Sequence, residues 1–391
     1  MNQSQALRPQ FDRVQQIALG AGAAGLAVTL VGAFVSREQF FQAYLFGYVF
    51  WTGMGLGCLA LMLLQYLVRG SWGFPIQRLL EAGARTLPLM ALLFVPLIVG
   101  LPFIYLWARP EAVANDALLQ AKSAYLNVPF FIVRTVLYFV LWGAMTYLLN
   151  RRAQAVEGST DLEQIGGLRQ VSALSLLLFS LTVTFALIDW VMSLEPHWYS
   201  SIYPLMVAIG AIVTALAFVI AVALWLATRE PLSQAITPRT LNDWGSLLLA
   251  FVMIWAYLAF SQFFLMWSAN LAEEIPWYLR RMQGGWQWAA LFLVIFHFAL
   301  PFLLLLARDL KRNARVLSAV AILLVVAELV DVFWLVMPVF HEAGLSVHWL
   351  DIAAPLGIGG IWLAAFVWQL KGRSLLPAEA LQRHSRQDLQ D

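Results

Sequence analysis

Residues 170–201 read QVSALSLLLFSLTVTFALIDWVMSLEPHWYSS and contain a long apolar run. The run carries no charged side chain before Asp189, and the next ionisable residues, Glu195 and His197, flank a proline. About 20 consecutive apolar residues suffice for an α-helix to cross the hydrocarbon core of a bilayer. The stretch therefore predicts a membrane-spanning helix that ends near Asp189 and is followed by a polar loop.

The rest of the chain has the same apolar character. Of its 391 residues, 61% are hydrophobic and 12% charged, and the mean hydropathy is +0.76. A soluble domain carries about 25% charged residues, and backbone groups inside lipid must be paired within helices or closed barrels. We therefore predict an all-α polytopic membrane protein with about ten transmembrane helices. The expected spans are 17–35, 40–68, 86–107, 129–149, 170–193, 203–227, 243–268, 286–308, 316–340 and 350–370.

These spans are expected to form a single transmembrane domain, residues 17–370, between an N-terminal tail (1–16) and a C-terminal tail (371–391). The charges of the loops predict its orientation, because Lys and Arg concentrate in short cytoplasmic loops. The connections that follow spans 1, 3, 5, 7 and 9 hold five Lys and Arg residues, and the tails with the other connections hold eighteen. Both tails are therefore expected in the cytoplasm, and the loop with Glu195 and His197 on the outer face.

The sequence lacks the residues that most bound redox cofactors require. Cys58 is the only cysteine, which excludes an intrachain disulfide and a cysteine-ligated iron–sulfur cluster, and we expect it to be a buried packing residue. His297 is the only histidine expected in mid-membrane, whereas a two-haem membrane cytochrome needs facing pairs. Phosphate-loop, zinc-protease and serine-hydrolase motifs are also absent. The chain is therefore expected to bind no cofactor of its own.

Two charged residues are expected near the outer ends of neighbouring spans. Arg134 lies five residues into span 129–149, about 8 Å from its end at 1.5 Å per residue, and Asp189 lies at a similar depth in span 170–193. An ion pair between them would offset part of the desolvation cost of both. Charged residues inside a membrane are functional candidates by default. A structural pair and a part of a proton pathway are both open interpretations.

Three further ionisable residues fall near the middle of spans 8 and 9. His297 lies eleven residues into span 286–308, and Glu328 and Asp331 lie in span 316–340. The i, i+3 spacing of the two acids puts them on one helical face, and each ionised acid there costs on the order of 3 kcal/mol. Two acids so close favour a retained or shared proton. This pattern predicts a proton relay; neutral acids bonded to neighbouring helices are the alternative.

The outer connections 195–204 and 267–286 combine aromatic with charged residues. Trp198, Trp277 and Tyr278 are interpreted as interfacial anchors, because amphipathic rings settle at the headgroup level. The charged residues of these loops form either a docking surface for a partner protein or a solvated loop. The members of this candidate surface are Glu195, His197, Glu273, Glu274, Arg280 and Arg281.

Four blocks of the sequence resemble one known family. They are RLLEAGARTLP (78–88), AYLNVPFFIVRTVLYFVLWG (124–143), IDWVMSLEPHWYSSIYP (188–204) and FVMIWAYLAFSQFFLMWSANLAEEIPWYLRR (251–281). From its second to its ninth span, the chain is similar to the F subunits (ActF) of alternative complex III, a bacterial quinol:electron-acceptor oxidoreductase. Asp189 lies within the DWVMSLEP part of the third block.

The resemblance implies a ten-helix protein of the NrfD/PsrC-like class, in which spans 2–5 and 6–9 form two four-helix bundles. It also implies a multi-pass protein of the bacterial cytoplasmic (inner) membrane. The expected partners are a homologous membrane protein (the C component of the complex), an iron–sulfur subunit, multihaem cytochrome c subunits and small single-span subunits, so haem c and iron–sulfur clusters belong to the partners. In this family the quinol site is placed in the homologous C component, and the F subunit is proposed to provide a proton route. A contribution of this chain to quinone binding stays open.

The sequence is therefore compatible with two functions. The first is a cofactor-free subunit of a quinol-oxidising complex that conducts protons across the membrane. Its candidate residues, ordered from the cytoplasmic to the outer side, are Gln65, Tyr66, His297, Glu328, Asp331 and Asp189 with Arg134. The second is a proton-coupled secondary transporter, which ten helices and buried acids would fit equally well. A purely structural anchor for extrinsic subunits would leave the buried acids unexplained.

Overall fold

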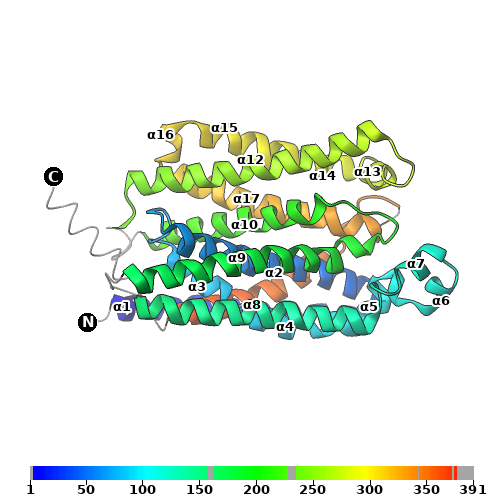
Figure 1. Cartoon of the computed structure of the whole chain (residues 1–391), viewed down its shortest axis with the longest axis horizontal. Helices are drawn as coiled ribbons and strands as arrows, with labels where there is room; N and C mark the ends of the chain where they lie inside the picture. Colours follow the sequence, from blue (N-terminus) through cyan, green and yellow to red (C-terminus); the bar gives the residue numbers. More distant parts are fainter. Residues whose placement is uncertain (1–2, 157–161, 228–234, 342, 372–373, 377–391) are drawn as a thin grey trace.

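The computed structural model describes residues 3–156, 162–227, 235–341, 343–371 and 374–376, and every regular element within these ranges is a helix (Figure 1). In the first half of the chain these are α1 (Gln3–Val35), α2 (Arg37–Val68), α3 (Gln77–Ala84), α4 (Leu87–Leu93), α5 (Val95–Ile104), η1 (Leu106–Ala108), α6 (Pro110–Ala114), α7 (Ala117–Lys122), α8 (Val128–Val156), α9 (Leu162–Trp190) and η2 (Met192–Leu194). The second half contains α10 (Tyr203–Leu226), α12 (Pro238–Ala269), α13 (Pro276–Arg281), α14 (Trp286–Phe292), the π-helix η3 (Leu293–Ala299), α15 (Leu300–Leu306), α16 (Arg308–Lys311), α17 (Ala314–Val336), η4 (Met337–Val339) and α18 (Leu350–Leu370).

The length and composition of these helices confirm a helical, multi-pass architecture. Nine helical segments of the described residues are long and apolar enough to cross a membrane. The number rises to ten when the bent pair Gln77–Leu93 and Val95–Ile104 is counted as one span. The predicted spans thus coincide with helices, with one difference in the third span.

The third span was expected to be one continuous helix over 86–107, and this expectation is wrong. The structure breaks it into α4 and α5, and the axis bends by 58° at Phe94. Pro88 and Pro96 occupy the first turns of α4 and α5. Proline has no backbone N–H and its ring clashes with the preceding turn, so it begins a helix readily and interrupts one that is already formed. The two prolines therefore account for a segmented span.

The expected N-terminal tail is also largely helical. Helix α1 begins at Gln3, so residues 3–16 of the expected tail continue the helix of the first span. The ammonium group of Lys371, just after α18, bonds to Asp12 and Gln15 and ties this polar first part of α1 to the end of α18. Apart from residues 371 and 374–376, the predicted C-terminal tail lies outside the described residues.

Polar caps set the starts of three long helices. The Ser36 hydroxyl accepts a hydrogen bond from the N–H of residue 39 and so separates α2 from α1. Thr237 forms a reciprocal capping box before Pro238 at the start of α12, and the Asn313 side chain accepts two N–H groups at the start of α17. Such side chains satisfy donors that a helix start would otherwise leave unpaired.

Helices α2 and α10 form the centre of the molecule. Helix α2 packs against α3, α5, α9, α10 and α18, and α10 in turn packs against α12 and α17. At the periphery, α1 lies along α18 so closely that a Cβ added to Gly25 would come within 2.7 Å of the backbone of Gly357. Small residues permit such close helix packing in membranes, where lipid is as apolar as the protein.

The two ends of the molecule differ in character (Figure 1). At one end lie α6, α7, α13 and the connections 105–127, 191–202, 270–285, 340–341 and 343–349; we call it the loop end. The start of α1 and the end of α18 lie at the opposite end, which we call the terminal end. Cys58, in the second half of α2, is fully buried, as predicted.

Candidate functional site

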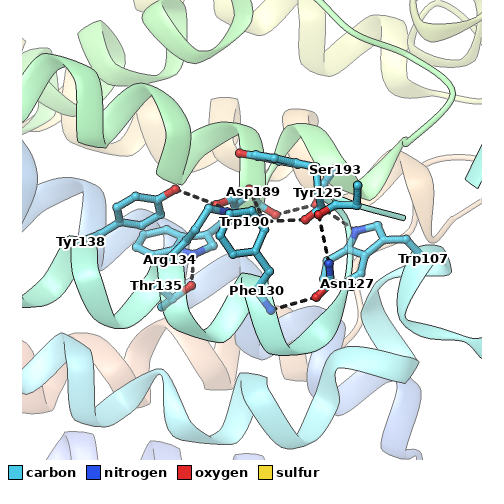
Figure 2. A network of polar contacts seen from close by, with 11 residues as sticks. Trp107, Tyr125, Asn127, Phe130, Arg134, Thr135, Tyr138, Asp189, Trp190 and Ser193 are labelled. Carbon is cyan, nitrogen blue, oxygen red and sulfur yellow. Dashed lines mark hydrogen bonds and ion pairs between the residues drawn. The ribbon is translucent and has the colours of Figure 1, made fainter. Parts of the chain in front are cut away.

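A first polar cluster joins α8 to α9 near the loop end (Figure 2). Asp189 is the penultimate residue of α9, as the apolar run predicted, and Arg134 lies in the second turn of α8. The Arg134 guanidinium donates from Nε and Nη2 to the two carboxylate oxygens of Asp189, each at 2.9 Å. Asp189 is 0% exposed and Arg134 7%. The ion pair considered from the sequence therefore forms, with the bidentate geometry that makes such pairs strong.

Further hydrogen bonds and aromatic contacts surround this ion pair. The Tyr138 hydroxyl donates to Asp189 at 2.8 Å, and Nη1 of Arg134 donates to the carbonyl of Tyr125 at 3.0 Å. The guanidinium also lies 3.9 Å from the ring centroid of Tyr125 and 4.2 Å from that of Phe130, so aromatic faces cover its positive charge. A buried charge pair is stable only when the remaining donors and acceptors are satisfied in this way.

The end of α9 is held by hydrogen bonds to the surrounding aromatic residues (Figure 2). The Trp190 indole donates to Thr135, and the Trp107 indole donates to Ser193, whose hydroxyl bonds back to the Asp189 carbonyl. The Tyr105 hydroxyl donates to the Trp190 carbonyl at 2.8 Å. Carbonyls at the last turn of a helix have no partner within the helix, and these contacts fix the backbone that carries the Asp189 carboxylate.

A second cluster lies between η3 and α17 and contains His297, Glu328 and Asp331. Their ligand atoms all lie within 4.8 Å of one another, and the three side chains are 1%, 3% and 3% exposed. Nε2 of His297 is 3.3 Å from Oε2 of Glu328. The shared helical face of the two acids is thereby confirmed. The approach of His297 to Glu328 from another helix is a tertiary contact that no spacing in the sequence could predict.

This second cluster contains polar atoms that are not fully hydrogen-bonded within the described residues. Among the described residues, Nδ1 of His297 and Oε2 of Glu328 have no well-aligned hydrogen-bond partner. His297 sits on a π-helical segment, a rare conformation that is often found at functional sites. One imidazole and two carboxylates can exchange protons with one another, and they are also donors that suit a divalent transition metal.

Two residues that the sequence analysis missed shape this cluster. The Trp255 ring contacts the His297 ring at a centroid distance of 4.0 Å, and its indole N–H donates to Asp331 at 3.2 Å. On α10, a Cβ at Gly210 would lie 2.5 Å from Oε1 of Glu328, so the carboxylate rests directly against the helix backbone. Trp255 occurs in one of the blocks that carry the family resemblance, but a tryptophan in an apolar helix has no local signal that assigns it to an acid.

At the terminal end, the two candidate entrance residues have different environments. The Tyr66 hydroxyl donates to Oε1 of Glu81 at 2.7 Å, whereas the Gln65 amide donates to the carbonyl of Gly70 at 3.1 Å. Glu81 is 2% exposed and also accepts a hydrogen bond from Arg78 at 2.9 Å. Glu81 was missed although it is an isolated acid in the apolar segment 79–84, which is the available signal.

At the loop end, a triad of charges joins two connections. Oε2 of Glu195 accepts a hydrogen bond from Nη1 of Arg280 at 2.9 Å, and Oε1 of Glu195 forms an ion pair with Nη2 of Arg281 at 3.0 Å. Arg281 is 0% exposed, stacks 3.6 Å from the Trp277 centroid and donates to two carbonyls near the end of α17. Burial lowers the pKa of Arg281, and Glu195 opposes this effect. Arg281 is thus a buried structural residue, whereas Arg280 is half-buried and Glu273 is exposed at the surface.

The aromatic residues of these connections are not interfacial anchors, contrary to the sequence-based interpretation. Trp198, Trp277 and Tyr278 are 5%, 2% and 6% exposed. Trp198 stacks on Trp277 with a centroid distance of 4.8 Å, and Tyr278 packs edge-on against Trp277. The loops fold inward over the helix ends, so these rings pack against one another instead of against lipid headgroups.

His197 reaches a different partner, on the α6–α7 segment. Its Nε2 lies 2.6 Å from Oδ2 of Asp116, and the ring is half-exposed. Asp116 is the N-cap of α7. Hydrogen bonds from the N–H of Leu119, then from His197 and the N–H of Leu118, lower the pKa of Asp116 below its usual 3.8.

The candidate residues thus form separate groups: Arg134 with Asp189 in one cluster, His297 with both central acids in another, and the charged residues of the loop end in contacts of their own. Searches against family models and against curated proteins found no match for this chain.

Proposed function

We propose that this chain is a cofactor-free membrane subunit of a quinol:electron-acceptor oxidoreductase of the alternative complex III type, and that it provides a proton pathway through the bacterial cytoplasmic membrane. The observation that carries the proposal is the buried group of His297, Glu328 and Asp331, with its 3.3 Å contact between imidazole and carboxylate. Ionisable side chains inside transmembrane segments are unfavourable in free energy, and they are characteristic of proton relays in membranes.

In this proposal the loop end faces outward and the terminal end faces the cytoplasm, in agreement with the charge bias of the loops. The packing of α2 against α9, of α4 against α8 and of α8 against α9 supports a first four-helix bundle made of spans 2–5. The contacts of α10 with α12 and α17, and of α12 with α15, support a second bundle made of spans 6–9. The central cluster then belongs to the second bundle, and the Arg134–Asp189 pair to the first.

The chemistry of the relay follows from the contacts of its members. A proton that reaches the cluster is held on Nε2 of His297 or on the Glu328 carboxylate, between which it moves over a short distance. The indole N–H of Trp255 donates to the Asp331 carboxylate and fixes its position, and we assign Asp331 as the member that passes the proton toward the outer side. On the cytoplasmic side Tyr66 and Glu81 are the candidate entrance, and on the outer side Asp189 and Glu195 are two candidate exit acids.

The functional test begins with purification of the tagged protein from its native membrane in mild detergent. Stoichiometric c-type haem and iron–sulfur subunits in the preparation would support the proposal, and a haem-free protein that purifies alone would refute it. In the intact complex, Glu328→Gln and Asp331→Asn should lower the number of protons released per quinol oxidised. Asp189→Asn and Glu195→Gln, compared in the same assay, decide which acid serves the exit.

A proton-coupled secondary transporter is the second candidate, and one observation favours it. Transporters with inverted repeats contain broken helices at corresponding positions of their two halves. Here the third span is bent by 58° and the eighth contains the π-helix η3. Repeats keep their order along the chain, so the third span would correspond to the seventh, which is the continuous helix α12. The broken third span by itself, and not a repeat, is therefore what favours this class. Substrate-dependent proton uptake by the isolated protein in vesicles would establish this alternative.

A further inference from the structure

A groove of about 620 Å³ opens at the loop end. Segments distant in sequence line it: the end of α5 with η1, the start of α7, the connection 194–198, the segment 272–280 and the end of η4. In Figure 1, α6 and α7 and the connection that carries α13 project at this end on opposite sides of the molecule. Sites that enclose a ligand have volumes of about 300–1,000 Å³ and arise where separate elements meet.

Fixed contacts hold the walls of the groove. His197 and Asp116 join the connection 194–198 to the cap of α7, and the Lys122 ammonium donates to the Pro196 carbonyl at 2.7 Å. On the other side, Arg280 joins segment 272–280 to Glu195. The groove is therefore preformed, and binding of a ligand would cost little conformational entropy of these loops.

The charge of the groove favours an acidic ligand. Glu195 is shared between Arg281 and Arg280, so this triad keeps one positive charge, on the partly exposed Arg280. Arg109 is exposed, and the hydrogen bonds it makes within the described part of the chain go to the carbonyls of Pro102 and Phe103, not to a carboxylate. Glu273 is the other acid on the lining. The lining thus holds two arginines and two acids, and Arg281 buried behind it leaves one net positive charge.

Apolar side chains lie between these charges. Leu106, Leu118 and Phe340 line the groove, and Leu118 is 37% exposed although it is a large apolar residue. A polar rim around an apolar centre is the composition of a protein–protein interface. Most of the walls are loops and short helices, and the ends of α2 and α5 at the loop end complete the lining. In the proposed orientation the groove therefore opens toward the outer aqueous side.

We propose that this groove is the docking site for a segment of an extrinsic partner protein, which places an acidic side chain between Arg109 and Arg280 and an apolar side chain against Leu118. The inference rests on the proposed function, because it requires a partner on the outer side. It revises the docking surface that was predicted from the sequence. Arg109 and Leu118 are added to that surface and Arg280 stays in it, whereas Arg281 is excluded because its side chain is buried.

The decisive experiment places a photo-crosslinking amino acid at position 118 and irradiates the complex purified from native membranes. The expected product joins this chain to an extrinsic subunit, through a peptide with an acidic residue next to the crosslinked position. The control is the same amino acid at Glu111, which is exposed on α6 but does not line the groove, and which should give no such product. A complex that contains its haem subunits but crosslinks from position 118 only to lipid, or not at all, would overturn the docking site and leave the proposed function intact.

A charge series gives an independent readout. Arg109→Glu should speed dissociation of the extrinsic subunit in moderate salt about tenfold, because a like charge would face the incoming acid, whereas Arg109→Lys should change it less than about twofold. The thermal unfolding of each variant chain shows that the bundle is intact. Equal dissociation rates for the two variants would contradict the assigned role of Arg109.

Discussion

The Arg134–Asp189 pair permits a quantitative test of how this membrane protein holds its charges. In Arg134→Met, Asp189 loses both charge-assisted hydrogen bonds, and among the described residues its carboxylate keeps the 2.8 Å bond from Tyr138. The carboxylate stays fully buried, so its desolvation is no longer compensated. Breaking a buried pair from one side costs about 3–5 kcal/mol, and we expect the free energy of unfolding to fall by that amount.

Removing both charges should be much less harmful. In Arg134→Met with Asp189→Leu no ion remains to be desolvated, and an apolar pair of similar volume is often neutral. The Tyr138 hydroxyl then lacks its acceptor, which costs about 1–3 kcal/mol, and a further Tyr138→Phe change should recover that loss.

The assay is reversible unfolding in mixed micelles, followed by tryptophan fluorescence. The control is Arg37→Met, an exposed arginine outside the cluster, which should stay within about 0.5 kcal/mol of the unmodified protein. We expect a coupling energy of at least about 2 kcal/mol between the two positions. Additive losses in the double variant would refute the argument that the cost arises from an unpaired buried charge.

Three further predictions concern the other contacts. Gly210→Ala should destabilise the protein by about 1–3 kcal/mol, because the new Cβ would lie 2.5 Å from Glu328; the unfolding assay measures this, and an unchanged stability would argue against the close contact. Trp255→Phe keeps a ring beside His297 but removes the hydrogen bond to Asp331, so proton release by the complex should slow. Trp255→Leu also removes the ring and should slow it further. A rate in Trp255→Phe equal to that of the unmodified complex would contradict a role for the N–H. The pKa of Asp116 is lower in the folded protein, so its stabilising effect is present above about pH 4 and is lost as the pH falls through the folded value; melting temperatures between about pH 2 and pH 6 should therefore depend less on pH in Asp116→Asn.

Local features of the chain were sufficient for a large part of the architecture. Apolar runs located the spans, since the length of a run and the absence of charge are properties of consecutive residues. The i, i+3 spacing placed Glu328 and Asp331 on one face, and the end of an apolar run placed Asp189 at the end of its helix. Pro88 and Pro96, which lie in the first turns of α4 and α5, were also visible in the sequence, but a hydropathy window averages over many residues and does not register a single proline.

The contacts between helices became known only from the tertiary structure. His297 contacts Glu328, Trp255 donates a hydrogen bond to Asp331, and Glu195 forms ion pairs with Arg280 and Arg281. In each case the residues belong to elements that are far apart in the chain. The sequence-based view of Trp198 and Trp277 as lipid anchors was wrong for the same reason, because an aromatic loop residue can face headgroups or fold over helix ends. In a membrane the lipid-facing and the interior-facing sides of a helix are both apolar, so hydrophobic periodicity carries little information on rotation. Which side chains meet is therefore decided by the packing of helices against one another.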